Sequence, residues 1–209
     1  MDTYRLYQNV VAAGTLYTLA MTTEVCETLG LATVPREVPP GWRPVTEIAG
    51  LPEDFINWSA SRRHRIEDTL DVLTDQYVKD HGHLPSERGR HGLGRWAAQE
   101  TRPAKKPKPL APLLAWWRAS AILRFCQQLI DGLLDRCRAA GAAIRPRVDP
   151  AVDVTLAAAV DVAAVVFTVR EKFSRCHILA EARRHLLEAL RGREYTRGLD
   201  DYICARTRY

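Results

Sequence analysis

The sequence contains few cysteines, and their spacing excludes the sites that cysteine usually builds. Among 209 residues there are only five, Cys26, Cys126, Cys137, Cys176 and Cys204, and no two form a Cys-x-x-Cys pair. The sequence therefore indicates neither a disulfide framework nor a zinc knuckle. We expect most of these thiols to be small core residues in a reducing, cytoplasmic environment.

Long uninterrupted apolar runs are also missing. The most apolar stretch, residues 151–169, contains Asp153 and Asp161. An ionised carboxylate near the centre of a membrane span costs about 3 kcal/mol, so this stretch is better explained as a buried helix. The polar start at Asp2–Arg5 gives no indication of a signal peptide. We expect no membrane contact.

The common catalytic motifs do not occur. There is no Gly-x-Ser-x-Gly elbow, Walker loop, dinucleotide fingerprint or His-Glu-x-x-His. His81 and His83 have the spacing with which a strand presents two imidazoles to a metal, but Gly82 and Pro85 place them in a turn. We therefore predict no catalytic residue, no metal site and no cofactor. A polar turn explains the two histidines, with a metal site as the alternative.

The pattern of apolar, proline and glycine residues predicts a mainly α fold with a small β-hairpin (α+β). Helices are expected over residues 6–29, 53–81, 87–102, 113–139, 150–170, 175–191 and 197–205. Short strands are expected at residues 32–34 and 45–48, joined through a Pro-Pro-Gly turn. Residues 104–112 contain three prolines and are expected to be extended, and Gly141 is expected to end the helix before it.

The first of these helices is expected to be amphipathic. Its apolar residues recur at helical spacing, at Leu6, Val10, Ala13, Leu16, Ala20 and Val25. Tyr7 and Tyr17 lie on the same helix, and we expect them to pack in the core rather than to act as nucleophiles.

Positive charge is concentrated in residues 87–118, called the basic segment below. It holds eight Arg and Lys residues against two acids, so its net charge of 8 − 2 = +6 exceeds the +5 of the whole chain. The cations are Arg88, Arg90, Arg95, Arg102, Lys105, Lys106, Lys108 and Arg118. Trp96, Trp116 and Trp117 are interleaved with them. Cations neutralise phosphates and flat rings stack on exposed bases, so the pattern favours a polyanion-binding surface. A solvated basic linker is the alternative.

Several motifs then follow one another in a characteristic order. These are LYTLAMTTEVCETLGL at residues 16–31, RPVTEIAGLP at 43–52, WSASRRHRIE at 58–67, a Thr-Arg-x-x-Lys element at 101–105, and SRCHILAEA at 174–182. In order and spacing they resemble the conjugative relaxases of the TrwC/TraI (MobF) type, downstream of the catalytic strands, over most of residues 6–191. Ser59, Arg62 and Ile66 match the Ser-x-x-Arg-x-x-x-Ile pattern of that family.

The resemblance implies a helical relaxase portion at residues 1–140 and a helical link toward a helicase domain at 141–209. It implies binding of single-stranded or transfer-origin hairpin DNA, and Arg62, Thr101, Arg102 and Lys105 match its motifs. The charge of the basic segment adds Arg95, Lys106 and Lys108 to the expected DNA-binding residues. Tyr4, Tyr7 and Tyr17 do not match the family's nucleophile motif, and no strand matches its histidine motif, so no catalytic residue is carried over.

Three functions follow as hypotheses. The first is a DNA-binding relaxase fragment that does not nick DNA alone, with a separate catalytic relaxase half or a helicase as candidate partners. The second is a helical protein-interaction module, or a truncated remnant without independent function. The third is an intact enzyme that uses its own histidines, which predicts metal-dependent nicking of supercoiled plasmid.

Overall fold

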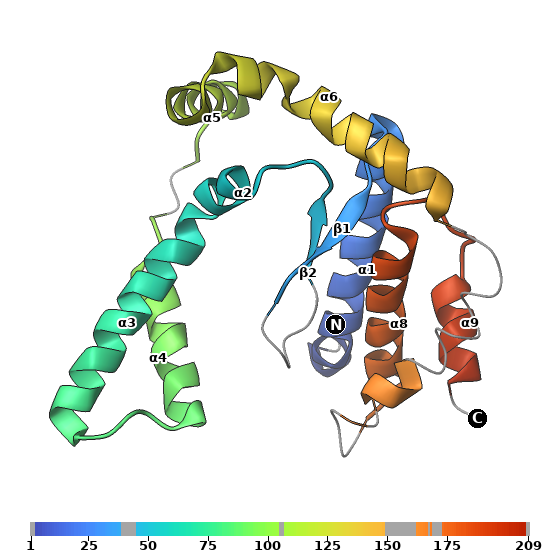
Figure 1. Ribbon diagram of the computed structural model, residues 1–209. Helices are drawn as coiled ribbons and strands as arrows, with labels where there is room; N and C mark the ends of the chain where they lie inside the picture. Colours follow the sequence, from blue (N-terminus) through green and yellow to red (C-terminus); the bar gives the residue numbers. More distant parts are fainter. Residues whose placement is uncertain are drawn as a thin grey trace. The chain divides into compact units, whose positions relative to one another are not determined.

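The protein is mainly α-helical with one small β-hairpin, as the sequence predicts (Figure 1). The structure, a computed structural model, describes residues 3–38, 45–104, 107–148, 162–166, 168 and 173–207. The elements are α1 (Thr3–Leu29), β1 (Thr33–Arg36), β2 (Val45–Ile48), α2 (Glu53–Ser59), α3 (Ser61–His81), α4 (Glu87–Glu100), α5 (Leu110–Phe125), α6 (Gln127–Ile144), η1 (Arg145–Arg147), α8 (Arg175–Leu190) and α9 (Leu199–Arg206).

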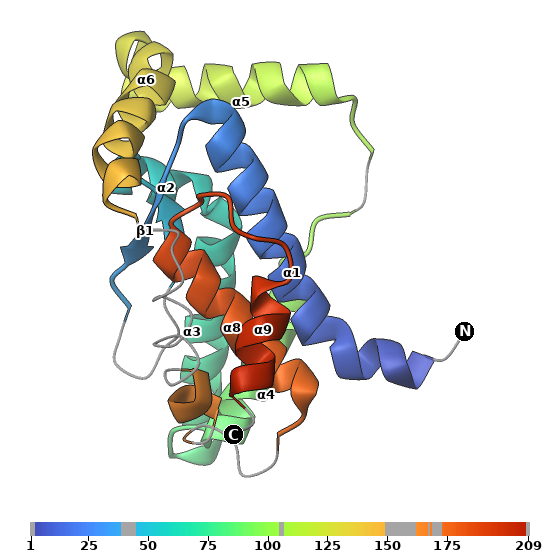
Figure 2. The same ribbon diagram turned by 90° about the vertical axis from the view of Figure 1, so that its right-hand side faces the viewer.

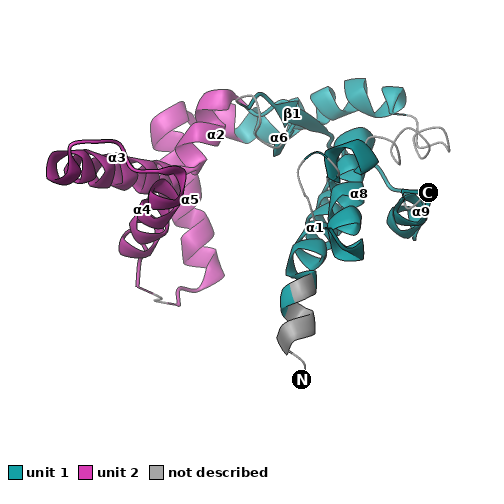
Figure 3. Cartoon of the chain, turned by 90° about the horizontal axis from the view of Figure 1, so that it is seen from below, with its two compact units in different colours: residues 1–51, 131–209 teal, residues 52–130 magenta. Residues whose placement is uncertain are grey.

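The chain forms two compact units (Figure 3). Unit 1 comprises Met1–Leu51 and Asp131–Tyr209, and unit 2 comprises Pro52–Ile130. The division between a relaxase-like part and a helicase-proximal part at residue 140 is a different property of the chain, and it stays a prediction.

Unit 1 is built around α8, which packs against both α1 and α9 and lies between them in Figure 1; Figure 2 shows the same three helices after a quarter turn. The buried side chains that form its core are Ala12, Leu19, Val162, Val166, Ile178, Leu179, Ala182, Leu186, Leu190, Ile203 and Cys204. Residues 162–166 are helical, whereas most of the apolar stretch 151–169 lies outside the described residues. Within the described part of the chain, no helix has the length and apolar character that crossing a membrane requires.

The buried face of α1 is not the one that the sequence predicts. Ala12, Leu19 and Cys26 are buried, at intervals of seven residues. The stripe that includes Val10, Leu16 and Val25 is exposed instead. Ala12 and Leu19 belong to the core that α1 shares with α8, whereas Cys26 packs with Leu31 and Cys137.

The two tyrosines of α1 are also exposed to solvent. The exposed fractions of Tyr7 and Tyr17 are 83% and 67%, so the expectation that they pack in the core is wrong. They lie on the side of the helix that faces away from α8, together with Met21. The side chain of Leu6, which the sequence places on the same stripe, lies outside the part of the chain that the structure describes.

The hairpin and α6 pack at the end of α1. Strands β1 and β2 are antiparallel, with Thr33 opposite Ile48 and Arg36 opposite Val45, and the expected Pro-Pro-Gly turn lies outside the described residues. Gly141 does not end α6, which continues to Ile144. A Cβ at Gly141 would stand 2.6 Å from the carbonyl oxygen of Gly30, so this glycine is a point of close approach rather than a helix stop.

Two ion pairs join distant parts of unit 1. The Nε of Arg183 donates to Asp200 at 2.7 Å, and its Nη1 donates to the Ala12 carbonyl at 2.6 Å, which links α8 to α9 and α1. Glu27 pairs with Arg145 and accepts the N–H of Glu194 at 2.8 Å. Burial opposes ionisation of Glu27, but these partners outweigh it and lower the pKa of its carboxyl.

Unit 2 contains two breaks that the sequence does not predict. The helix expected at residues 53–81 is divided at Ala60, whose φ and ψ are −82° and 26°. The Ser59 hydroxyl donates to the Ile56 carbonyl at 2.8 Å and competes there with the helical hydrogen bonds. The helix expected at 113–139 is divided at Cys126, which has φ 69° and ψ 157°.

The extended segment before α5 is shorter than the sequence predicts, because α5 begins before residue 112. Pro109 is the N-cap of α5, which begins at Leu110, so Pro112 lies in the first helical turn. Proline is tolerated there because the first N–H groups of a helix have no intrahelical acceptor. The extended part therefore ends at Pro109.

Candidate nucleic-acid interface

Helices α3 and α4 form a hairpin that carries Arg62 and Arg95, and the other expected DNA-binding residues follow α4 in the chain (Figure 1). The turn begins at Gly82, a left-handed C-cap with φ 72°. It ends at Ser86, whose hydroxyl accepts the Gly89 N–H at 3.2 Å and caps α4. The caps hold the two helices side by side.

Arg62 and Thr101 both bond to carbonyl groups of the last turn of α4. Nη2 of Arg62 donates to the Ala98 carbonyl at 3.3 Å, which joins the start of α3 to the end of α4. The Thr101 hydroxyl donates to the Ala97 carbonyl at 2.7 Å, and Ala97 is buried. Arg62 therefore joins the two helices and remains exposed, whereas the Thr101 hydroxyl bonds back to a carbonyl of α4 itself.

Arg95 lies on a basic face of α4 that sequence reasoning did not single out, and Arg102 follows just beyond the end of that helix. Arg88 and Arg95 are seven residues apart on α4, which is two helical turns or about 10 Å, and Arg102 stands seven residues further along the chain, directly after the C-cap Thr101. Arg88, His91 and Arg95 line a shallow hollow with Glu87. The heptad spacing was visible in the sequence and was the signal for Arg88.

These arginines keep their charge available. Arg88, Arg95 and Arg102 are exposed. No carboxylate among the residues with described positions forms an ion pair with any of them. An exposed guanidinium without a carboxylate partner can bind a phosphate without first breaking an ion pair.

The lysines of the basic segment are only partly described. Lys108 is exposed in the extended stretch immediately before α5. Lys105 and Lys106 lie outside the described residues. The structure thus joins Arg62 to the last turn of α4, places Thr101 and Arg102 directly after that helix, and places Lys108 on the following connection.

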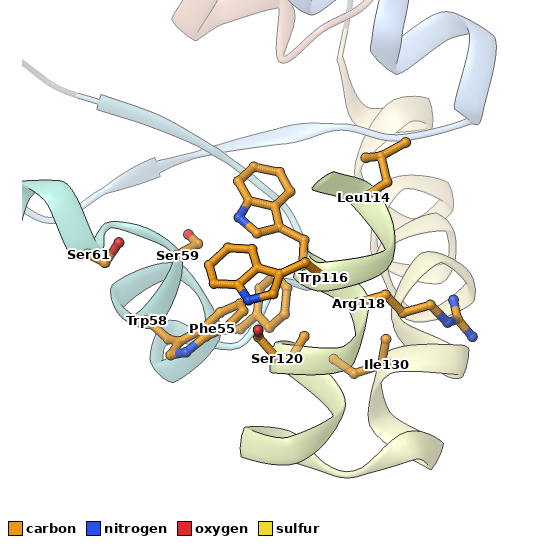
Figure 4. A pocket seen from close by; sticks show the side chains of 11 residues that line it. Phe55, Trp58, Ser59, Ser61, Leu114, Trp116, Arg118, Ser120 and Ile130 are labelled. Carbon is orange, nitrogen blue, oxygen red and sulfur yellow. The ribbon is translucent and has the colours of Figure 1, made fainter. Parts of the chain in front are cut away.

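A pocket between α2 and α5 is the second feature of unit 2 (Figure 4). It has a volume of about 500 Å³ and is called the aromatic pocket below. Its lining residues are Phe55, Trp58, Ser59, Ser61, Leu114, Trp116, Trp117, Arg118, Ser120, Ala121 and Ile130. The sequence indicated Trp116 and Trp117, but it did not indicate that α2 supplies the opposite wall.

Packed rings form one wall of the aromatic pocket. The ring centroids of Phe55 and Trp58 are 5.7 Å apart, and both contact Phe125 at 5.5 and 5.6 Å. These tilted and edge-on arrangements are favourable for aromatic pairs and fix the wall. Trp116 and Trp117 are in contrast 62% and 59% exposed.

The histidine pair lies in the α3–α4 turn and faces backbone carbonyls. The Nδ1–H of His81 donates to the Tyr77 carbonyl at 3.0 Å, and that of His83 donates to the Leu84 carbonyl at 2.9 Å. His81 also stacks on Tyr77, with centroids 4.1 Å apart. No group of three or more metal-binding side chains gathers here or elsewhere among the described residues.

Comparison with known proteins gives one family. The family model described as TrwC relaxase matches residues 1–122, more than half of the chain. The match includes the whole α3–α4 hairpin, Lys108 and both tryptophans of α5. Neither a curated protein nor a solved structure matches the sequence.

Proposed function

The chain belongs to the TrwC relaxase family, and from this premise we propose that it is a cytoplasmic DNA-binding part of a conjugative relaxase. Unit 2 binds single-stranded DNA or the transfer-origin hairpin through the basic face of α4 and the lysines that follow it. The main support for this proposal is the set of exposed arginines Arg88, Arg95 and Arg102, which lies inside the family match. None of the three has a carboxylate partner among the described residues.

Charge supports this assignment. The basic segment alone exceeds the net charge of the chain, so the rest of the molecule is close to neutral or slightly acidic. A polyanion would therefore be attracted to one region rather than to the whole surface. Arg62, Thr101, Lys105, Lys106 and Lys108 complete the proposed binding set.

The test is fluorescence anisotropy with a labelled single-stranded oligonucleotide at about 50 mM and about 200 mM salt. Each lost phosphate contact lowers the slope of log K against log salt by about 0.7 for single strands. We expect the triple variant Arg88→Ala, Arg95→Ala, Arg102→Ala to bind more weakly, with a slope lower by about 2.

A second triple variant controls for overall charge. Arg136→Ala, Arg147→Ala, Arg197→Ala removes the same three charges from exposed positions of unit 1. It should bind like the wild type. Equal losses in the two triple variants would show that binding follows net charge and would contradict the proposed surface.

We further propose that the chain does not nick DNA alone. The imidazoles of His81 and His83 are held by backbone carbonyls in a turn, and Tyr7 and Tyr17 lie on α1 in unit 1. Incubation with supercoiled plasmid and Mg²⁺ or Mn²⁺ should leave the plasmid supercoiled. Metal-dependent nicking that His81→Ala abolishes would instead establish an intact enzyme.

The exposed face of α1 favours a second candidate function, a protein-interaction module. Tyr7, Val10, Tyr17 and Met21 are exposed on one side of this helix. Contiguous exposed apolar side chains are typical of interaction surfaces. We propose a separate catalytic relaxase half as the partner, with a helicase as the alternative partner.

Light scattering after size-exclusion chromatography tests the α1 surface. If this face of α1 binds other proteins, the isolated wild type should self-associate through it. The double variant Tyr17→Glu, Met21→Glu should then be monomeric. A monomeric wild type that ignores a co-expressed catalytic half would exclude this function. Neither outcome changes the DNA-binding test, because α1 lies in unit 1.

A further inference from the structure

We propose that the aromatic pocket of unit 2 binds an unpaired nucleobase of single-stranded DNA between Trp116, Trp117 and the α2 wall. This inference rests on the proposed DNA-binding function and specifies which part of the DNA strand enters the pocket. Phosphates contact the basic face of α4 and Lys108, whereas the pocket takes a base. The size of the pocket, about 500 Å³, lies in the range of small-molecule sites.

The faces of the two exposed indoles are available for stacking. Trp116 and Trp117 are more than half exposed, and no ring contact among the described residues involves either of them. Exposing two adjacent tryptophans to water is unfavourable unless a ligand covers them. Every base presents a flat π-face, so indoles of this kind bind bases with little sequence preference.

The opposite wall is already rigid. Phe55, Trp58 and Phe125 hold one another at centroid distances between 5.5 and 5.7 Å. A ligand that enters therefore meets a preformed surface and does not pay to assemble it. A planar group matches a site whose walls are rings better than a branched aliphatic side chain does.

The polar groups at the pocket select a nucleotide over an apolar side chain. Ser59, Ser61 and Ser120 contribute hydroxyl groups, as Figure 4 shows. Since the Ser59 hydroxyl already donates to the Ile56 carbonyl, its lone pairs can accept from an N–H group of a base, such as N3–H of thymine. Arg118 is the one charged side chain among the lining residues that the structure describes.

Cations of α5 suit the phosphates that flank such a base. Arg118 follows Trp117 directly, and the guanidinium of Arg124 lies 5.2 Å from the ring centroid of Phe125. Lys108 precedes the same helix by two residues. The pocket therefore combines ring faces with positive charge, and both are needed to hold a single strand.

The pocket also predicts a preference for single strands. Bases in a duplex are stacked and paired, and extruding one costs a few kcal/mol. A base in a single strand can enter without this cost. We therefore expect tighter binding of a single strand than of a duplex with the same sequence.

The test compares two probes that differ only in their bases. One is a labelled oligothymidine of about 12 nucleotides, and the other is the same length of abasic residues with all phosphates kept. At low salt the wild type should bind the oligothymidine about tenfold more tightly or better. The double variant Trp116→Ala, Trp117→Ala should lose this preference and bind the abasic probe unchanged.

Two controls accompany the double variant. Trp116→Phe with Trp117→Phe keeps stackable rings and should retain most of the preference. Leu123→Ala removes a 91% exposed side chain from the same helix, away from the pocket, and should bind like the wild type. Equal far-ultraviolet circular dichroism of all variants would establish that α5 remains folded.

The outcomes separate this inference from the proposed function. Equal binding of both probes by the wild type would keep DNA binding and overturn the base site. A base preference that survives in the double alanine variant would also overturn it, because the base would then bind elsewhere. Binding to a duplex as tight as to the single strand would overturn it as well. Failure to bind either probe would overturn both proposals.

Discussion

The two units use their side chains in opposite ways. Unit 1 buries leucine, isoleucine and valine side chains between α1, α8 and α9, and Leu19, Leu186 and Ile203 are almost fully inaccessible. In unit 2, among the described residues, only Ala97 and Ala121 are buried. Its large aromatic residues remain partly exposed. The stability of the chain is therefore expected to reside in unit 1, while unit 2 leaves most of its side chains accessible to a ligand.

Arginine shows the same contrast. In unit 1, Arg145 and Arg183 are mostly buried and paired with Glu27 and Asp200. Along α4 the arginines are exposed, without a carboxylate partner in the described part of the chain. One residue type thus stabilises the fold in one unit and remains available for a ligand in the other. The predictions below test this difference.

The largest expected effect is the loss of the buried ion pair of unit 1. Asp200→Ala leaves the Arg183 guanidinium buried without its carboxylate and should lower the free energy of unfolding by about 3–5 kcal/mol. The side chains of Arg183 and Asp200 are only 11% and 8% exposed, so water cannot replace the missing partner well. Urea denaturation followed by circular dichroism measures the loss.

The neighbouring residue provides a matched control for that prediction. Asp201 pairs with Arg175 on the surface, where both side chains are more than half exposed. Asp201→Ala should cost at most about 1 kcal/mol. Similar losses for the two aspartates would contradict the assignment of Arg183 and Asp200 to a buried, stabilising role.

The second prediction compares one leucine from each unit. Leu186→Ala removes a fully buried side chain of α8 and should cost about 2–5 kcal/mol. Leu123→Ala removes an exposed side chain of α5 and should change stability by less than about 0.5 kcal/mol. The same urea experiment measures both. A large loss for Leu123→Ala would mean that unit 2 has a core that its exposed surface conceals.

The smallest effect is a dependence of stability on pH that resides in unit 1. The pKa of Glu27 is lowered in the fold from its ordinary value near 4.5. A lowered carboxyl pKa stabilises the fold above the ordinary value, and this contribution disappears as the pH falls through the pKa of the folded state. Glu27→Gln should therefore be less stable than the wild type at neutral pH.

The pH dependence of that difference is the measurement. The gap between wild type and Glu27→Gln should narrow steadily in thermal unfolding experiments as the pH falls below 4.5. A gap that stays constant over this range would mean that the Glu27 carboxylate does not contribute through its charge.

The sequence predicted the type of most elements because local signals determine them. The helices expected to end at residue 29 and to begin at residues 87 and 175 do so in the structure, where Gly30, Ser86 and Ser174 flank them. The breaks at Ala60 and Cys126 were not predicted, because neither residue carries a signal that ends a helix. Gly141 was misjudged because a close approach to Gly30 cannot be recognised from local sequence.

The candidate site was predictable in its charge but not in its geometry. The basic segment and the tryptophans of α5 are visible as composition, and the seven-residue interval from Arg88 to Arg95 could have been read as one helix face. The contribution of Phe55 and Trp58 could not, because it depends on α2 packing against a helix that follows more than fifty residues later in the chain. Similarly, only the fold reveals that Arg62 contacts Ala98.

The break at Cys126 gives the molecule a natural attachment point for a spectroscopic label. Cys26, Cys137 and Cys204 are buried and Cys176 is partly covered, whereas Cys126 is exposed. Burial also raises the pKa of the Cys26 and Cys137 thiols, which slows their alkylation. A maleimide dye should therefore attach first at Cys126, beside Phe125. Its emission would then report on a ligand that enters the neighbouring aromatic pocket.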